Sequence, residues 1–200
     1  MDLVPTPSQT AGPYFHLGMT ETRSVKCIAD RQTKGERVWL ACRVIDGDGV
    51  PVPDAMIEIW QADAEGKYNH PDDTQGDDTT GDDTQGKTID SPWFGFGRMP
   101  TLQDGSCEFE TIKPGRVPGP RNALQAPLLN VAIFARGMLK QLYTRMYFAG
   151  DPANSEDAVL ALVPQERRES LLAQPVVSHP GHWRFDIHLQ GERETVFFDV

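Results

Sequence analysis

Short apolar segments, each bounded by turn residues, recur along most of the chain and restrict it to a fold built from β-strands. Within a segment, apolar and β-branched residues either alternate with polar ones or run together, which is typical of strands. The segments are RVWLACRVID, AMIEIWQA, CEFETI, LLNVAIF, QLYTRMYF and HWRFDIHL, and Gly191 allows a turn into a last strand. No βαβ rhythm accompanies them, so we predict an all-β fold, an antiparallel β-sandwich with short helical segments.

The N-terminal region differs from the rest and is expected to form an extended arm. Residues 6–16, TPSQTAGPYFH, are rich in proline and lack an apolar period, which argues against a helix and against the middle of a strand. We predict that residues 1–36 form this arm and a linker, and that residues 37–200 form the sandwich. Helical content is expected within residues 152–173, where Pro164 can occupy a first turn.

An acidic, low-complexity insert interrupts the strand pattern at residues 70–88, HPDDTQGDDTTGDDTQGKT. It contains glycine and carboxylates but no large apolar residue, so it cannot bury a core and is expected to form a mobile surface loop. A calcium loop is the alternative that its carboxylates raise. The spacing D-x-[DN]-x-[DN]-G with a closing Glu is missing, which disfavours that reading.

Charge and cysteine content exclude several classes of protein. A net charge of -10 disfavours binding to nucleic acid or to anionic membranes. Three widely spaced cysteines without a CxxC pair argue against a thiolate zinc site and fit a reduced, cytoplasmic setting; Cys42 and Cys107 are expected to be small buried residues. No secretion signal and no run of apolar residues long enough to span a membrane are visible.

Common catalytic motifs are missing, and the histidines are scattered. No phosphate-binding glycine loop and no GxSxG turn occurs. His179 and His182 form an HPGH pair that is interpreted as a hairpin tip, with a metal site as the weaker alternative. His188 is expected to be a partly exposed residue on a strand. No two histidines stand two positions apart, so no H-x-H pair is available to a metal ion.

Several ordered motifs resemble those of the intradiol catechol dioxygenases. They are SQTAGPY, EIWQADAEGKY, FGFGR, TIKPG, FARG and RFDIHLQGERETVFFDV. The resemblance implies a β-sandwich core and an obligate protomer of two homologous chains, α and β, within a large oligomer. It also implies the reaction, which is intradiol cleavage of protocatechuate by O2 to 3-carboxy-cis,cis-muconate in the β-ketoadipate route.

The family's catalytic β chain binds non-haem Fe(III) through two tyrosines and two histidines, and the resemblance locates the corresponding positions here. The first tyrosine is retained as Tyr68, whereas Val117 stands at the second tyrosine position and Leu128 and Asn130 stand at the histidine positions. Valine and leucine offer no lone pair to a metal. This chain is therefore expected to be a non-catalytic α chain whose partner β chain binds the iron, and Tyr68 is expected to be a buried aromatic residue.

The resemblance further implies that the α chain completes the substrate pocket of its partner. The implied substrate-binding residues are Thr10, Gly12, Pro13, Tyr14 and Arg136. A docking strap for the arm and an intersubunit salt bridge for the arginine are the structural alternatives.

Two other functions stay open at this point. One is a self-sufficient dioxygenase that uses Tyr68 with His70, His179 or His182. The other is a metal-free β-sandwich interaction module.

Overall fold

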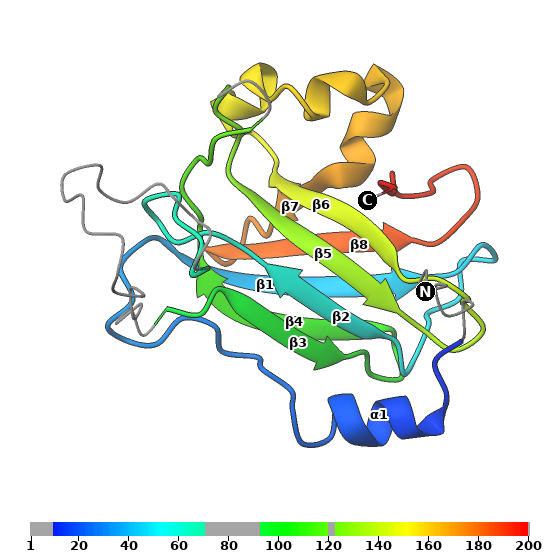
Figure 1. The fold of residues 1–200 in the computed structure, drawn as a ribbon. Helices are drawn as coiled ribbons and strands as arrows, with labels where there is room; N and C mark the ends of the chain where they lie inside the picture. Colours follow the sequence, from blue (N-terminus) through cyan, green and yellow to red (C-terminus); the bar gives the residue numbers. More distant parts are fainter. Residues whose placement is uncertain (1–9, 71–92, 120–122, 200) are drawn as a thin grey trace, which may run out of the picture.

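Eight strands form one mixed sheet in the computed structural model, which describes residues 10–70, 93–119 and 123–199 (Figure 1). Their order across the sheet is β3-β2-β5-β6-β7-β8-β1-β4. The strands are β1 Arg37–Ile45, β2 Met56–Trp60, β3 Phe96–Pro100, β4 Ser106–Ile112, β5 Leu128–Phe134, β6 Leu142–Phe148, β7 Leu172–Pro175 and β8 His182–His188.

The sheet is mainly but not wholly antiparallel, which corrects one part of the prediction. The mainly-β content is confirmed, but the strands form one mixed sheet rather than an antiparallel β-sandwich, and β1 pairs with β8 and β6 pairs with β7 in parallel. Parallel neighbours need a long crossover between them. The segment 149–171 supplies one between β6 and β7, because it leaves the sheet in three short helices before the chain returns. The last strand expected after Gly191 is also wrong, since only an isolated bridge joins Tyr143 to Phe198 there.

The two edge strands, β3 and β4, approach each other, so the sheet is nearly closed into a barrel (Figure 1). A Cβ atom added to Gly97 on β3 would lie 2.9 Å from a ring carbon of Phe109 on β4, which explains why glycine stands there. The segment Val25–Ile28 runs along this gap. Val25 exchanges two backbone hydrogen bonds with Arg98 on β3, and Ile28 donates to Glu110 on β4. Part of the expected linker therefore joins the two edges.

The core lies between the two halves of the folded sheet and follows the alternation seen in the sequence. On β1 every second side chain is at most 1% exposed, beginning at Val38. Cys42 and Cys107 face each other across β1 and β4 and are both buried, as expected. The other strands contribute the apolar residues Ile57, Ile59, Phe109, Leu129, Val131, Ile133, Met146, Phe148, Phe185 and Ile187.

The expected short helical segments are present beyond β6. Three 3-10 helices, η2 Pro152–Glu156, η3 Leu160–Leu162 and η4 Gln165–Leu171, pack a second apolar cluster against β5 and β6. Pro164 occupies the position directly before η4. None of the helices in the described ranges has the length and apolar character needed to cross a membrane.

The N-terminal arm contains a helix, so the exclusion of a helix from residues 6–16 was wrong at its end. Helix α1 spans Pro13–Met19 and is preceded by its N-cap residue Gly12, whose backbone is extended. Proline fits the first turn of a helix because its missing N–H has no partner there and its φ is already helical. Residues 6–9 and nearly all of the acidic insert lie outside the described residues. The division of the chain into 1–36 and 37–200 stays a prediction.

Candidate functional site

Two of the four positions that the resemblance assigns to iron ligands lie side by side next to β2. The Tyr68 ring stacks on Trp60, with ring centroids 6.0 Å apart and planes 6° from parallel. The Asn130 side chain on β5 donates a hydrogen bond of 3.2 Å to the Tyr68 hydroxyl. It also lies 3.4 Å from the Trp60 carbonyl oxygen. The half-buried tyrosine thus has a local polar partner, close to the expectation of a buried aromatic residue.

The other two positions carry hydrocarbon side chains that are packed away from water. Leu128 precedes Asn130 by two residues on the same face of β5, and both Leu128 and Val117 are only 4% exposed. We call Tyr68, Val117, Leu128 and Asn130 the Tyr68 site.

The side chains of the Tyr68 site do not fit a ferric ion. A hard ferric ion takes anionic oxygen and imidazole ligands, whereas the Tyr68 site offers one phenol, one neutral amide and two hydrocarbon groups. Within the described residues, no group of three or more His, Cys, Asp or Glu side chains could hold a metal ion either.

The histidines of the HPGH pair, His179 and His182, lie beside β1. His182 stacks on Trp39 of β1 with centroids 4.9 Å apart, and His179 lies edge-on to it at 5.5 Å. A backbone hydrogen bond from His182 N to the His179 carbonyl closes a tight turn, so the hairpin-tip interpretation is confirmed. Tyr68 packs instead on Trp60 at the end of β2.

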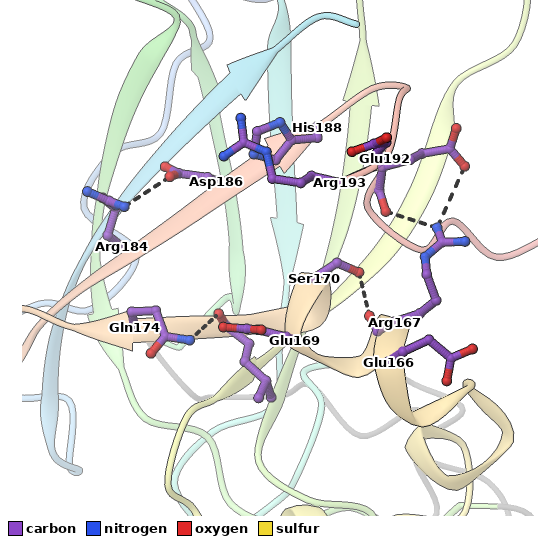
Figure 2. Close-up of a pocket in the computed structure, with 12 residues that line it drawn as sticks. Glu166, Arg167, Glu169, Ser170, Gln174, Arg184, Asp186, His188, Glu192 and Arg193 are labelled. Atoms are coloured by element: carbon purple, nitrogen blue, oxygen red, sulfur yellow. Dashed lines mark hydrogen bonds and ion pairs between the residues drawn. The ribbon is translucent and has the colours of Figure 1, made fainter. Parts of the chain in front are cut away.

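A charged cavity of about 340 Å³ lies between β7, β8 and η4, away from the residues singled out for substrate binding (Figure 2). Many of its charges are paired, as in Arg184 with Asp186 at 3.1 Å and Arg167 with Glu194 at 3.8 Å. His188, partly exposed as expected, lines it beside Arg193. Burial lowers the pKa of His188, and the Arg193 guanidinium lowers it further against the opposing effect of Asp186.

A second site lies where the N-terminal arm meets the end of β5. The backbone N–H of Gly137 donates a 2.8 Å hydrogen bond to the Thr10 hydroxyl. The Phe15 ring packs on Phe134 with centroids 5.7 Å apart. We call Thr10–Thr20, Asp54 and Phe134–Gly137 the arm site.

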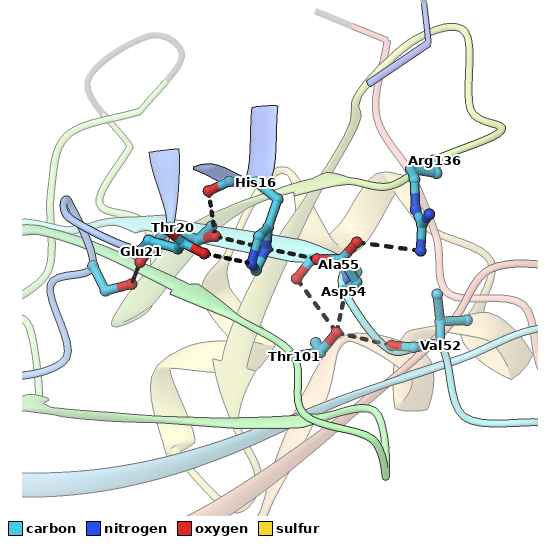
Figure 3. A network of polar contacts seen from close by, with 9 residues as sticks. His16, Thr20, Glu21, Val52, Asp54, Ala55, Thr101 and Arg136 are labelled. Atoms are coloured by element: carbon cyan, nitrogen blue, oxygen red, sulfur yellow. Dashed lines mark hydrogen bonds and ion pairs between the residues drawn. The ribbon is translucent and has the colours of Figure 1, made fainter. Parts of the chain in front are cut away.

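One carboxylate links the two sides of the arm site (Figure 3). Asp54 Oδ1 lies 2.7 Å from His16 Nδ1 on α1, and Asp54 Oδ2 lies 3.3 Å from an Arg136 guanidinium nitrogen. Sequence reasoning missed both Asp54 and His16. The only signal was an aspartate in the proline-rich turn VPVPDA, a residue type that tolerates the left-handed backbone observed there, with φ 58°.

Some of the predicted substrate-binding residues lie close together in the arm site, and Tyr14 is largely exposed to solvent. Thr10, Gly12 and Arg136 lie together, Pro13 starts α1, and the Tyr14 side chain is 84% exposed. The cavity between arm and sheet measures only about 10 Å³, roughly the space of one water molecule. An aromatic substrate cannot fit there, so any substrate contact must be made by the outer surface of the arm site.

The fold and the Tyr68 site together define a dioxygenase-like chain without its metal ligands, and comparison with known proteins supports that class. A family model described as Dioxygenase matches residues 10–191. The chain belongs to the intradiol dioxygenase family.

Relatives within the family define the chain further. It is 38% identical to the protocatechuate 3,4-dioxygenase alpha chain of Pseudomonas putida, over 100% of this chain and 98% of the relative. It is 40% identical to the alpha chain from Burkholderia cepacia, over 98% of this chain and 97% of the relative. The beta chain from Burkholderia cepacia is 33% identical over 80% of this chain and 67% of the relative.

Proposed function

We propose that this chain is the non-catalytic α subunit of a protocatechuate 3,4-dioxygenase. Its homologous β subunit binds the non-haem Fe(III), and the two form an obligate αβ protomer of a larger oligomer. The reaction is intradiol cleavage of protocatechuate by O2 to 3-carboxy-cis,cis-muconate. The role of this chain is to complete the substrate pocket of the β subunit with Thr10, Gly12, Pro13, Tyr14 and Arg136.

The observation that carries the proposal is the chemistry of the Tyr68 site. The Tyr68 hydroxyl faces a neutral amide, and buried hydrocarbon occupies the positions of Val117 and Leu128. A protein of an iron-dependent family whose described residues include no ligand set for iron needs a partner that carries one. The full-length similarity to alpha chains and the weaker similarity to a beta chain support such a pair.

The arm site supports the shared pocket. Gly12 has φ -95°, which any residue can adopt, and a Cβ atom added there would meet no atom within 4 Å. Glycine is accepted at this N-cap position of α1, and the open space around it also leaves room for close approach of a partner or substrate. The exposed Tyr14 and the Arg136 side chain, which is 66% exposed, give this surface an aromatic and a cationic group suited to an aromatic carboxylate.

Expression of the chain with and without a β chain tests the proposal. The isolated chain should bind no iron and consume no oxygen with protocatechuate. Coexpression with a homologous chain that carries both tyrosines and an H-x-H pair should give a complex with iron and with oxygen uptake. Iron and ring cleavage in the isolated chain would instead show a self-sufficient dioxygenase, and failure to form a complex would indicate a separate interaction module.

Substitution of Arg136 tests the role of the arm site within that complex. Arg136→Ala should raise the KM for protocatechuate and leave the iron content unchanged. Lys140→Ala is the matched control, because Lys140 is an exposed cation that pairs with Asp199 outside the arm site, and it should change neither value. A parallel fall in iron content with Arg136→Ala would assign the arginine to assembly.

A further inference from the structure

The carboxylate of Asp54 is the only group described in the arm site that contacts both the arm and Arg136 through its side chain. Each of its two oxygens contacts a different partner: Oδ1 faces His16 and Oδ2 faces the Arg136 guanidinium (Figure 3). Asp54 is 30% exposed and Arg136 is 66% exposed. The contact is made at one terminal nitrogen of the guanidinium, and most of the Arg136 side chain stays accessible to a partner or a substrate.

The backbone of Asp54 is fixed by groups in the core. Its N–H donates to the Thr101 carbonyl at 3.2 Å, and the next residue, Ala55, donates to the Thr101 hydroxyl at 2.9 Å. The Thr101 hydroxyl in turn donates to the Val52 carbonyl at 2.8 Å, and Thr101 is only 5% exposed. A carboxylate on a rigid turn can hold a flexible partner in one orientation at a small entropic cost.

The His16 side chain on the arm is also held in place by neighbouring groups. His16 Nδ1 lies 3.0 Å from the Thr20 hydroxyl, which donates to the His16 carbonyl at 2.9 Å. The other ring nitrogen of His16 lies 3.7 Å from Glu21. These contacts hold the imidazole against α1, so the bond to Asp54 fixes the helix as well as the ring.

We propose that Asp54 is a positioning residue: it holds the Arg136 guanidinium in the orientation that accepts the carboxylate of the substrate, and it fixes helix α1 beside it through His16. The inference rests on the proposed function, because it assumes that Arg136 faces an acidic substrate in the αβ complex. Without Asp54, Arg136 keeps its charge but loses its orientation, so recognition of the carboxylate weakens while the chemistry of the partner site is unchanged.

Two substitutions test the proposal without straining the backbone. Asp54→Gly removes the carboxylate and suits a φ of 58°, and Asp54→Asn keeps the shape and one oxygen acceptor but removes the charge. In the coexpressed αβ enzyme, Asp54→Gly should raise the ratio of the KM for protocatechuate to that for catechol, which lacks the carboxylate, on the order of fivefold. The kcat and iron content should not change, and Asp54→Asn should show a smaller effect.

A double-variant cycle shows whether Asp54 acts through Arg136. In the Arg136→Ala background, Asp54→Gly should change the KM ratio no further. An equal effect with and without the arginine, or an unchanged ratio in Asp54→Gly, overturns the inference while the proposed function stands. An unchanged ratio in Arg136→Ala overturns the role proposed for Arg136 itself, and with it this inference.

Hydrogen exchange on the isolated chain provides a readout that needs neither a β subunit nor activity. Asp54→Gly should speed amide exchange in α1, Pro13–Met19, and leave the exchange of β5 unchanged. His16→Ala should have the same effect on α1, and His16→Asn, which offers an amide N–H near the position of Nδ1, should restore protection. Unchanged exchange in α1 with Asp54→Gly would show that Asp54 does not hold the arm.

Discussion

Removal of the buried carboxylate of Asp157 should be the most destabilising single change near the Tyr68 site. Asp157 is 0% exposed and accepts hydrogen bonds from three backbone N–H groups: Ala126 at 2.8 Å, Val159 at 2.9 Å and Leu160 at 2.8 Å. The Tyr147 hydroxyl adds a longer contact of 3.4 Å. One side chain thus ties the turn before η3 to the chain just before β5, which begins at Leu128.

The magnitude follows from the donors left without a partner. Asp157→Ala leaves the buried N–H groups of Ala126 and Leu160 without a hydrogen-bond acceptor. Each unsatisfied group lowers the free energy of unfolding by about 1–3 kcal/mol. The N–H of Val159 is partly buried and adds less. The loss of unfolding free energy should therefore be about 4 kcal/mol. For a chain of 200 residues this corresponds to a fall in Tm of roughly 8–16 °C.

Denaturant and thermal unfolding of the isolated chain, followed by circular dichroism, measure this loss. Asp157→Asn should lose part of the stability, because an amide side chain has one acceptor oxygen where the carboxylate has two. Tyr147→Phe should lose less stability, because the contact of its hydroxyl with Asp157 is long. Burial raises the pKa of Tyr147 to about 12, so its hydroxyl stays protonated throughout the usual pH range. Asp199→Ala is the control, because the Asp199 side chain is 91% exposed and pairs with the exposed Lys140. If Asp157→Ala were as stable as this control, the anchoring role would be refuted.

Two further predictions concern titratable groups. Cys27 is exposed and should react quickly with a thiol reagent in the folded chain. Cys42 and Cys107 are buried and should react slowly, and the contact with Cys107 together with burial raises the pKa of the Cys42 thiol. Fast labelling of more than one thiol would contradict this prediction. Because the pKa of His188 is lowered on folding from about 6.5, the unfolded state binds its proton more readily, and stability should fall as the pH drops below about 6.5. Arg193→Ala should reduce this pH dependence in denaturant titrations at pH 7 and pH 5.5, and an unchanged difference would refute the contribution of the arginine.

Strands with a clear apolar pattern could be predicted from the sequence, and those shaped by tertiary contacts could not. The alternation on β1 and the apolar run on β5 show in the residues of each segment which side chains are buried. Strand β3 contains Gly97, which is explained only by the close approach of Phe109 and Ile28. Strand β7, Leu172–Pro175, has four residues directly after a 3-10 helix and no period to detect. The parallel pairings likewise depend on where a distant segment returns.

The arm shows a different limit of sequence reasoning. Its prolines argue against a helix in the sequence, but the effect of a proline depends on its position, and Pro13 stands where a helix accepts it. The residue that links the arm to Arg136 could not be found from spacing, because Asp54 lies far from both His16 and Arg136 in the sequence. Only the return of β5 beside β2, which begins at Met56, brings Asp54 and Arg136 together.

The Tyr68 site shows why substitution of metal ligands need not disturb a fold of this kind. A phenol in a half-buried position needs a hydrogen-bond partner whether or not a metal is bound, and the Asn130 amide supplies one at 3.2 Å. Leucine and valine at positions 128 and 117 contribute apolar burial that a set of polar ligands would not. The side chains at these four positions are therefore accommodated without a bound ion to offset unsatisfied ligands. Since the same packing removes the means to hold iron, the role that we propose for this chain in ring cleavage rests on the exposed arm site.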